Sequence, residues 1–285
     1  MVAIYVCSTR AIARFATCFR LIGVLMLVLA TGNLAQAQAP IQAPPWPSDT
    51  KLSGNAFLSP GLLKLQADVQ DSPVSLWLDK GQQQWADTQG GASCKSCHNT
   101  PDSLRQAVAA FPRLVKNASG NGQRLINLED QIVACRARAG RLRARAEDDD
   151  VLALSALLHN AAKGLPIAVK APAQSEAEWN AHLESGTALF ARRMGRINLA
   201  CVHCHEQSVG KQMRVDVISP GNPTGFPIYR MSWQKLGSMD RRLRACYSGV
   251  QAVIPPPGAT ELRELELYLK VRANGMPLDG PSIRR

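Results

Sequence analysis

Two short segments of the sequence carry the same reactive side chains in the same order, Cys-x-x-Cys-His, at residues 94–98 and 201–205. Two thiols three positions apart on a turn of helix can add to the two vinyl groups of one haem, and the adjoining imidazole can then bind the iron. The segments therefore predict two covalently bound haems c. The predicted thioether cysteines are Cys94, Cys97, Cys201 and Cys204, and the predicted proximal ligands are His98 and His205.

The same cysteine spacing occurs in zinc knuckles and in redox-active Cys-x-x-Cys pairs. A zinc site does not need a histidine directly after the second cysteine, and zinc knuckles rarely follow an export signal. We therefore favour haem attachment over both alternatives.

The first 37 residues have the pattern of a secretory signal. Three arginines precede an apolar run at residues 21–30, and small residues follow at 35–37. The run is too short to span a membrane and a small-residue cleavage site follows it, which favours a cleaved signal over an uncleaved N-terminal anchor. We expect cleavage after Ala37, a periplasmic location and no membrane span in the mature chain.

The chain is basic, with a formal net charge of +11. The predicted signal contains only three of the arginines and no acidic residue, so the mature chain stays basic. Aromatic and basic residues are not interleaved as in nucleic-acid binding proteins, and an exported protein would not ordinarily meet nucleic acid. The charge therefore favours anionic small molecules and acidic protein partners, although solvated basic surfaces are common.

The rest of the sequence reads as two similar halves. The spacing in the sequence from Cys135 to Cys246 equals the spacing between the two Gly-x-Pro turns, which begin at Gly164 and Gly275. The spacing between the two haem motifs is four positions shorter than the spacing between the two lone cysteines. The second half therefore has a four-residue insertion between its haem motif and its lone cysteine. Matching features in the same order predict one ancestral domain that has been doubled.

Each half has the element order of a small cytochrome c domain, with a helix, the haem motif, irregular loops and a closing helix. Leading acids and helical spacing of apolar residues predict closing helices at residues 150–158 and 261–269, and a Ser-x-x-Glu capping box predicts a helix at 175–190. No long stretch alternates every two residues, so few or no strands are expected. We predict a mainly α fold of two tandem cytochrome c-like domains from an internal duplication, at residues 51–170 and 171–285, after a signal peptide at 1–37 and a proline-rich extended segment at 38–50.

Cys135 and Cys246 are the cysteines left over once the signal and the haem tethers are set aside. A low-spin haem needs a sixth ligand, but no methionine lies between the first haem motif and its Gly-x-Pro turn, so methionine cannot serve both haems. His159 could serve the first haem, but its counterpart in the second half is Lys270. Equivalent positions in two repeats bind equivalent groups, which favours thiolate ligation of both irons over a disulfide between the domains.

The residues before the two cysteines differ. In a helix, the residue four positions earlier shares the face of the cysteine. That residue is Arg242 for Cys246 and Gln131 for Cys135. Guanidinium groups lower the pKa of a neighbouring thiol and bind oxyanions, so the second site is suited to an anion beside a reactive sulfur and the first is not. Arginines on a helix are also common on solvated surfaces, so this interpretation and the plain one stay open at this point.

Together these features resemble SoxA, the larger subunit of the SoxAX cytochrome of sulfur-oxidising bacteria, in its two-haem form. The resemblance covers essentially the whole mature chain. Besides the haem motifs, it rests on Asn-Leu-Glu at 127–129, Arg-Arg-Leu-Arg-Ala-Cys at 241–246 and Ala-Asn-Gly-Met-Pro at 273–277.

The resemblance implies an L-cysteine S-thiosulfotransferase that joins thiosulfate oxidatively to a cysteine of the carrier SoxYZ. It implies a heterodimer with the one-haem cytochrome SoxX and a small c-type cytochrome as electron acceptor. Cys246 would be the catalytic cysteine that becomes a persulfide, and Arg242 the substrate-binding arginine. The axial pairs would be His98 with Cys135 and His205 with Cys246.

Two other functions are compatible with the residues. A two-haem thiosulfate dehydrogenase that forms tetrathionate would use the same thiolate-ligated iron and cationic pocket without a protein carrier. A plain periplasmic electron-transfer cytochrome would need neither Arg242 nor a reactive Cys246.

Overall fold

The computed structural model describes residues 51–68, 70–117, 120–140 and 144–285, whose contacts group them in one unit. The predicted signal peptide, its cleavage site and the proline-rich segment lie outside the described residues. Within the described part of the chain, no helix combines the length and the apolar character that crossing a membrane requires.

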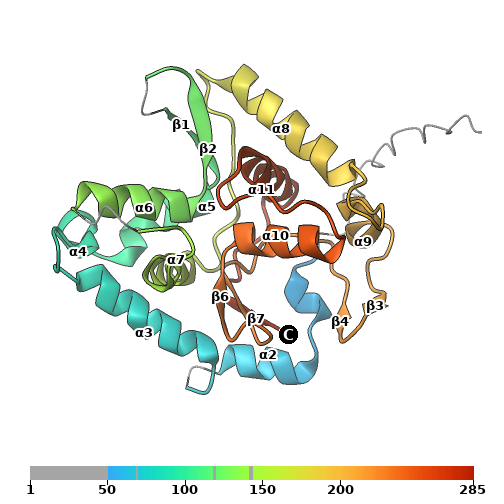
Figure 1. Ribbon diagram of the computed structural model, residues 1–285. Helices are drawn as coiled ribbons and strands as arrows, with labels where there is room; N and C mark the ends of the chain where they lie inside the picture. The colour runs from blue at the N-terminus through green and yellow to red at the C-terminus, as the bar shows by residue number, and fades with distance from the viewer. Residues whose placement is uncertain (1–50, 69, 118–119, 141–143) are drawn as a thin grey trace, which may run out of the picture. The chain divides into compact units, whose positions relative to one another are not determined.

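The unit is mainly helical, as predicted (Figure 1). Its first half contains α2 (Pro60–Ala67), α3 (Pro73–Ala86), α4 (Cys94–His98), α5 (Arg105–Ala109), α6 (Leu128–Arg138) and α7 (Asp149–Ala161), with 3₁₀ turns η1 (Gly54–Phe57) and η2 (Pro101–Leu104). Its second half contains α8 (Glu176–Ala191), α9 (Cys201–His205), α10 (Met239–Gly249) and α11 (Thr260–Arg272). The closing helices predicted at 150–158 and 261–269 are confirmed as α7 and α11.

The expectation of few or no strands needs a correction. β1 (Arg113–Lys116) pairs antiparallel with β2 (Gln123–Ile126), and β3 (Gln212–Met213) pairs antiparallel with β4 (Asp216–Val217). β5 (Ile228–Arg230) lies between antiparallel β6 (Lys235–Gly237) and parallel β7 (Ser282–Arg284). These strands are two to four residues long, too short to give a visible two-residue alternation.

The helix predicted at 175–190 is confirmed as α8, but its predicted capping box is not formed. No side chain caps the first turn of α8. Instead, Ser175 Oγ accepts a hydrogen bond from Gln123 Nε2 (2.7 Å), and Glu178 Oε1 accepts one from the Gln123 N–H (3.1 Å). Both side chains bind the start of β2, a tertiary partner that replaces the local cap.

Several elements of the two halves recur at one common offset, which is the spacing from Cys135 to Cys246. The first residues of α6 and α10 are separated by this offset, and so are those of α7 and α11. The turns after α7 and α11 pair with each other: the Gly164 N–H donates to Leu278 O (2.8 Å), and the Gly275 N–H donates to Ile167 O (2.9 Å). In the first bond the donor belongs to the first half of the chain, and in the second bond it belongs to the second half, so the pairing is reciprocal.

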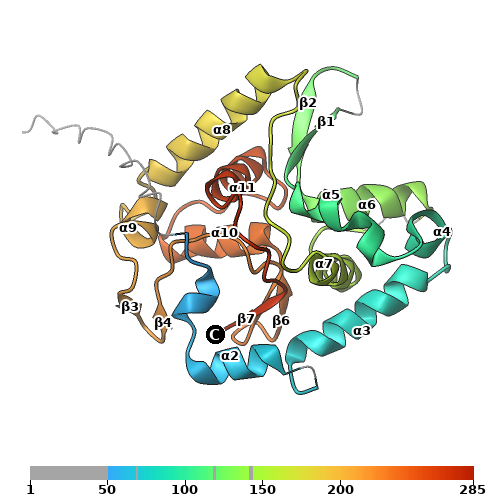
Figure 2. The same ribbon diagram turned by 180° about the vertical axis from the view of Figure 1, so that it is seen from behind.

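Two glycines allow the helices that precede and follow each haem motif to cross in direct backbone contact. A Cβ atom on Gly81 of α3 would lie 2.5 Å from Ala153 O of α7. A Cβ atom on Gly186 of α8 would clash with Glu264 O of α11. These crossings fix where the chain enters α4 and α9, and α7 and α11 lie between those two haem-motif helices (Figures 1 and 2).

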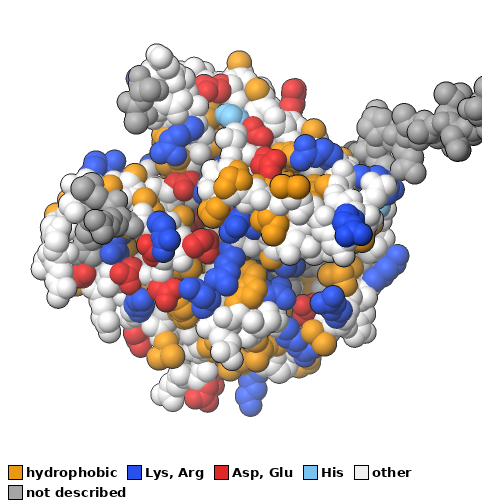
Figure 3. Space-filling view, viewed as in Figure 1, with side chains coloured by type: hydrophobic (Ala, Val, Ile, Leu, Met, Phe, Trp, Pro, Cys, Tyr) orange, Lys and Arg blue, Asp and Glu red, His pale blue; other side chains and the backbone are white. Residues whose placement is uncertain are grey.

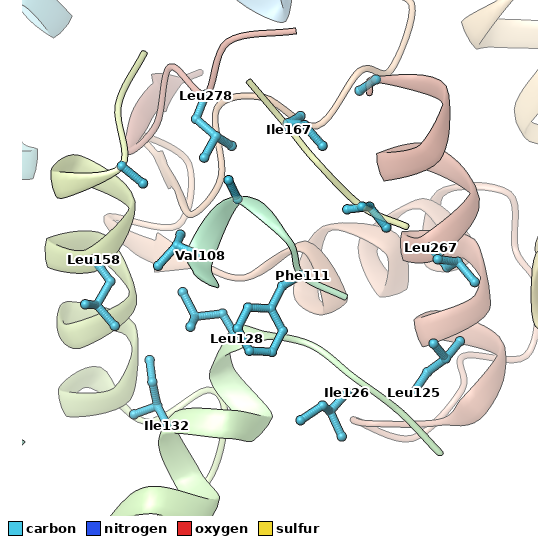
Figure 4. Close-up of a cluster of buried hydrophobic side chains, with 14 of the residues drawn as sticks. Val108, Phe111, Leu125, Ile126, Leu128, Ile132, Leu158, Ile167, Leu267 and Leu278 are labelled. Atoms are coloured by element: carbon cyan, nitrogen blue, oxygen red, sulfur yellow. The ribbon is translucent and has the colours of Figure 1, made fainter. Parts of the chain in front are cut away.

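The largest apolar core lies between α7 and α11. Figure 4 shows Leu158 on α7 and Leu267 on α11 at opposite sides of this cluster, with Phe111 and Leu128 between them. α7 is buried almost all round, because the four side chains from Val151 to Leu154 are each at most 1% exposed. The helices that precede the two haem motifs, α3 and α8, therefore pack on a rigid core, which fixes the positions of α4 and α9.

His159, the alternative haem ligand in the sequence, belongs to this core. Its side chain is buried with Glu129, Glu266 and Lys270 around a small cavity, and its Nδ1 lies 3.0 Å from Ser155 O. Burial, assisted by the charge of Lys270, lowers the pKa of His159 from 6.5 to about 3. His159 is therefore a neutral packing residue, and its counterpart Lys270 lines the same cavity.

We expect His159 to make the protein sensitive to acid. Its pKa of about 3 lies below the ordinary 6.5, so the unfolded chain takes up a proton that the folded chain does not. The resulting stability is complete above pH 6.5 and is lost as the pH falls towards 3. In urea unfolding, His159→Gln should therefore flatten the decline in free energy of unfolding between these pH values. A decline as steep as in the wild type would contradict this assignment.

Candidate haem sites

His205, the predicted proximal histidine of the second motif, is held in a fixed orientation. His205 Nδ1 donates to the carbonyl oxygen of Ser219 (2.8 Å), which leaves Nε2 as the nitrogen available to a metal. Gly221, at φ +79°, approaches the ring so closely that a Cβ atom there would lie 3.0 Å from Cγ and Nδ1 of His205. Burial lowers the pKa of His205, which keeps its imidazole neutral.

Cys246 lies close to the two predicted tethers of the second haem. Burial, together with the neighbouring charge of Cys246, raises the pKa of Cys201 to about 12. Burial and Cys246 also raise the pKa of Cys204. The C-terminal part of α10 lies beside α9 in both views (Figures 1 and 2). The structure therefore brings together one imidazole and three sulfurs from two helices.

The charges of Arg242 and of a residue that the sequence analysis missed, Arg230, act on the groups of this site. Arg230 of β5 is half-buried, and its pKa is lowered by burial and by the charge of Arg242, and raised by Asp216 and Cys246. Arg230, Arg242 and Cys246 thus lie within electrostatic range of one another. The charge of Arg242 also contributes to the lowered pKa of His205.

Trp233 joins the β5–β6 hairpin to α10. Its ring lies 5.5 Å from the guanidinium carbon of Arg230 and 4.5 Å from that of Arg241. A Cβ atom on Gly237 would lie 2.5 Å from the same ring, so glycine makes room for it. Lys and Arg side chains gather over β6 and the start of α10 (Figure 3). No local sequence signal relates Arg230 to Cys246, because the hairpin alone brings them together.

The first motif forms α4, which is positioned by a side-chain cap and by packing against the end of α6. Ser93 Oγ accepts a hydrogen bond from the Ser96 N–H (3.2 Å) and so caps α4. Gly91 packs on the carbonyl group of Ala139, one residue past the end of α6, where any Cβ atom would clash. The ring centroid of His98 lies 6.3 Å from that of Trp85 on α3.

Cys135 on α6 has polar neighbours that differ from those of Cys246. Its Sγ accepts hydrogen bonds from Gln131 Nε2 (3.1 Å) and from the Arg138 guanidinium (3.1 Å). Gln131 was identified from the sequence, but Arg138 was missed because only the residues before the cysteine were considered.

The disulfide alternative is wrong. Cys135 and Cys246, the two cysteines of that alternative, are both free thiols in the structure. The second site offers two cysteines for covalent attachment, the His205 imidazole with its Nδ1 already hydrogen-bonded, and the nearby sulfur of Cys246. This donor set fits a covalently attached haem with histidine and thiolate ligands. A mainly helical chain with such a site is a c-type cytochrome.

Comparison with known proteins narrows this class. The family model for the SoxA/TsdA cytochrome c domain matches residues 80–167. The chain is 31% identical over 243 residues to the L-cysteine S-thiosulfotransferase subunit SoxA of Pseudaminobacter salicylatoxidans, covering 84% of this chain and 82% of the relative. It is 29% identical over 239 residues to the SoxA subunit of Paracoccus pantotrophus, covering 83% and 80%.

The fold agrees with these sequence matches. A chain in the crystal structure of SoxXA from P. pantotrophus superimposes with a TM-score of 0.73 at 29% identity, covering 82% of this chain and 86% of that one. This chain belongs to the SoxA family of L-cysteine S-thiosulfotransferase subunits, which confirms the resemblance seen in the sequence.

Proposed function

We propose that this chain is the cytochrome subunit that conjugates thiosulfate oxidatively to the carrier cysteine of SoxYZ, as an L-cysteine S-thiosulfotransferase. The observation that carries the proposal is the position of Cys246, beside the second haem motif and within the electrostatic range of Arg242 and Arg230. A sulfur, a metal-binding imidazole and two guanidinium groups are what an anionic sulfur substrate needs for binding and oxidation. Membership of the SoxA family supports the same activity.

We infer that the chain carries two haems c on two duplicated cytochrome c-like domains, residues 51–170 and 171–285. The common offset of α6 and α7 from α10 and α11 supports this duplication, as do the reciprocal bonds of the two Gly-x-Pro turns. Cys94 and Cys97 would tether the first haem, and Cys201 and Cys204 the second.

His98 and Cys135 would bind the iron of the first haem, and His205 and Cys246 that of the second. When bound, the haems supply one-electron acceptors close to the reacting sulfur. The protein's part is to orient the ligands: the Ser219 carbonyl group fixes the ring of His205, and Gly221 lets the backbone approach it.

Arg242, with Arg230 beside it, would bind the thiosulfate dianion next to Cys246, because two guanidinium groups offset its two negative charges. In the overall reaction a sulfur–sulfur bond forms between the carrier cysteine and the outer sulfur of thiosulfate. The carrier thiol loses its proton, and two electrons leave to a small c-type cytochrome. Cys246 is the proposed catalytic cysteine; its thiolate would become a persulfide by taking the outer sulfur of thiosulfate, whose sulfur–sulfur bond breaks with sulfite as the leaving group.

We also infer a periplasmic location and a heterodimer with SoxX. The SoxXA crystal structure, in which one chain shares this fold, supports the SoxX partner. SoxYZ would be the carrier that brings the accepting cysteine to the site.

The proposed anion site predicts a graded loss of activity. Arg242→Ala should lower kcat/KM for thiosulfate about tenfold to a hundredfold, because a charge-assisted hydrogen bond contributes about 1.5–3 kcal/mol. Arg230→Ala should lower it in the same direction, and neither variant should lose haem. The control is Arg244→Ala, since Arg244 is on the same helix but its Nε donates to Pro255 O (2.9 Å). Wild-type kinetics in Arg242→Ala would contradict the proposed substrate site.

The activity itself is tested by thiosulfate-dependent reduction of cytochrome c by the protein purified with SoxX. We expect reduction to require SoxYZ. Reduction without the carrier, with tetrathionate as the product, would instead indicate a thiosulfate dehydrogenase. No reduction under either condition would leave simple electron transfer as the function.

A further inference from the structure

The sulfur of Cys135 is held by an anchored set of donors. Gln131 Nε2 and the Arg138 guanidinium each lie 3.1 Å from Sγ, and both come from α6 itself. Gln131 is fixed in turn, because Arg113 of β1 donates to its Oε1 (2.7 Å). The Arg113 guanidinium carbon lies 4.8 Å from the centroid of the Phe111 ring, which steadies it against the core.

The equivalent cysteine in the second half has different neighbours. At the common offset of the two halves, Gln131 corresponds to Arg242, and Arg138 corresponds to Gly249, which has no side chain. Cys135 and Cys246 therefore occupy the same position on equivalent helices but have different neighbouring side chains. The donors at Cys135 bind its own sulfur, whereas the charge of Arg242 at Cys246 acts on the half-buried cation Arg230 and lowers its pKa.

Hydrogen bonds to a ligating sulfur withdraw electron density from it. A thiolate that donates less to ferric iron stabilises that state less, so the reduction potential of the haem rises. The same bonds occupy the lone pairs through which the sulfur would attack a substrate. A thiolate that accepts no hydrogen bonds gives its haem a lower reduction potential and keeps its lone pairs available to attack a substrate.

We propose that Gln131 and Arg138 are positioning residues that keep Cys135 as a permanent ligand of the first haem and raise the reduction potential of that haem. The first haem then accepts electrons without its ligand taking up substrate sulfur, which remains the task of Cys246. This inference rests on the proposed ligation of the first haem by Cys135.

The test is a redox titration of the complete complex with SoxX, followed by low-temperature electron paramagnetic resonance of the ferric haems. The signal of the first haem is the one altered by Cys135→Ser. Gln131→Leu removes a donor without changing the charge, and Arg138→Gln removes the guanidinium. We expect each to shift the midpoint potential of the first haem downwards, the double variant to shift it furthest, and the second haem to stay unchanged.

Controls separate hydrogen bonding from charge and from misfolding. Lys95→Gln removes an exposed charge within the first haem motif, at a position that is neither a predicted tether nor a predicted ligand, so it measures the effect of charge alone. Arg138→Lys keeps a donor and should stay close to the wild type. Arg138 is exposed, so its variants decide the matter even if Gln131→Leu does not fold.

Three results would contradict three different claims. An unchanged potential of the first haem in the Gln131→Leu, Arg138→Gln double variant would overturn the role of these donors, while leaving the proposed activity intact. A Cys135→Ser variant with no altered haem signal would instead refute the ligation by Cys135 on which the inference rests. The proposed function itself would be refuted by a different result, the absence of thiosulfate turnover in the wild-type complex.

Discussion

Replacing Cys246 by alanine is expected to abolish thiosulfate conjugation while both haems stay attached. The proposed tethers are separate residues, Cys201 and Cys204, so loss of Cys246 would remove the proposed reacting sulfur and iron ligand without detaching the cofactor. Removing a catalytic nucleophile commonly costs a factor of about a thousand or more in kcat, and we expect a loss of at least that size. Steady-state reduction of cytochrome c by thiosulfate and carrier measures it.

The matched control is Cys135→Ala, the same change at the equivalent position of the first half. It should be tolerated far better, with a loss of no more than about tenfold, because Cys135 is proposed to be a permanent ligand and its sulfur already accepts hydrogen bonds from Gln131 and Arg138. If Cys135→Ala were the more damaging variant, the roles assigned to the two haems would have to be exchanged.

Arg263→Met is expected to cost about 3–5 kcal/mol in the free energy of unfolding, because it leaves buried charges without a partner. The Arg263 side chain is 2% exposed, and it binds Asp130 Oδ2 through Nε (2.6 Å) and Asp240 Oδ2 through Nη1 (2.9 Å). These carboxylates raise the pKa of Arg263, whose charge ties α6 and α10 to α11. Asp240 is itself 3% exposed, so water cannot replace the lost guanidinium.

Urea unfolding of the haem-loaded protein measures this loss. The control is Arg192→Met, which removes a surface pair with Glu261 (3.9 Å) whose side chains are 56% and 35% exposed, and should cost no more than about 1 kcal/mol. Equal losses in the two variants would show that the buried network contributes no more than a surface ion pair.

The sequence predicted those features that have a local chemical or periodic signature. The haem motifs fall on α4 and α9 because their function needs a fixed spacing, and α7 and α11 follow the helical spacing of their apolar residues. α8 was also located, but its cap was not, because Gln123 of a distant strand competes for Ser175 and Glu178. Local rules carry no information about such a partner.

The two site residues that the sequence analysis missed, Arg230 and Arg138, were missed for different reasons. Arg230 reaches Cys246 only through the β5–β6 hairpin, whose strands are too short to be recognised from the sequence. Arg138 lies one helical turn after Cys135, and its guanidinium folds back towards the sulfur. The helical reasoning that found Arg242 and Gln131 would have found Arg138 as well, had it been applied in both directions along the helix.

The central claim is tested most directly by the intact mass of SoxYZ after incubation with thiosulfate, oxidised cytochrome c and this protein purified with SoxX. We predict a thiosulfate adduct on the carrier cysteine with the wild-type protein and an unmodified carrier with Cys246→Ala. An unmodified carrier with the wild-type protein, while thiosulfate is consumed and tetrathionate accumulates, would contradict the account.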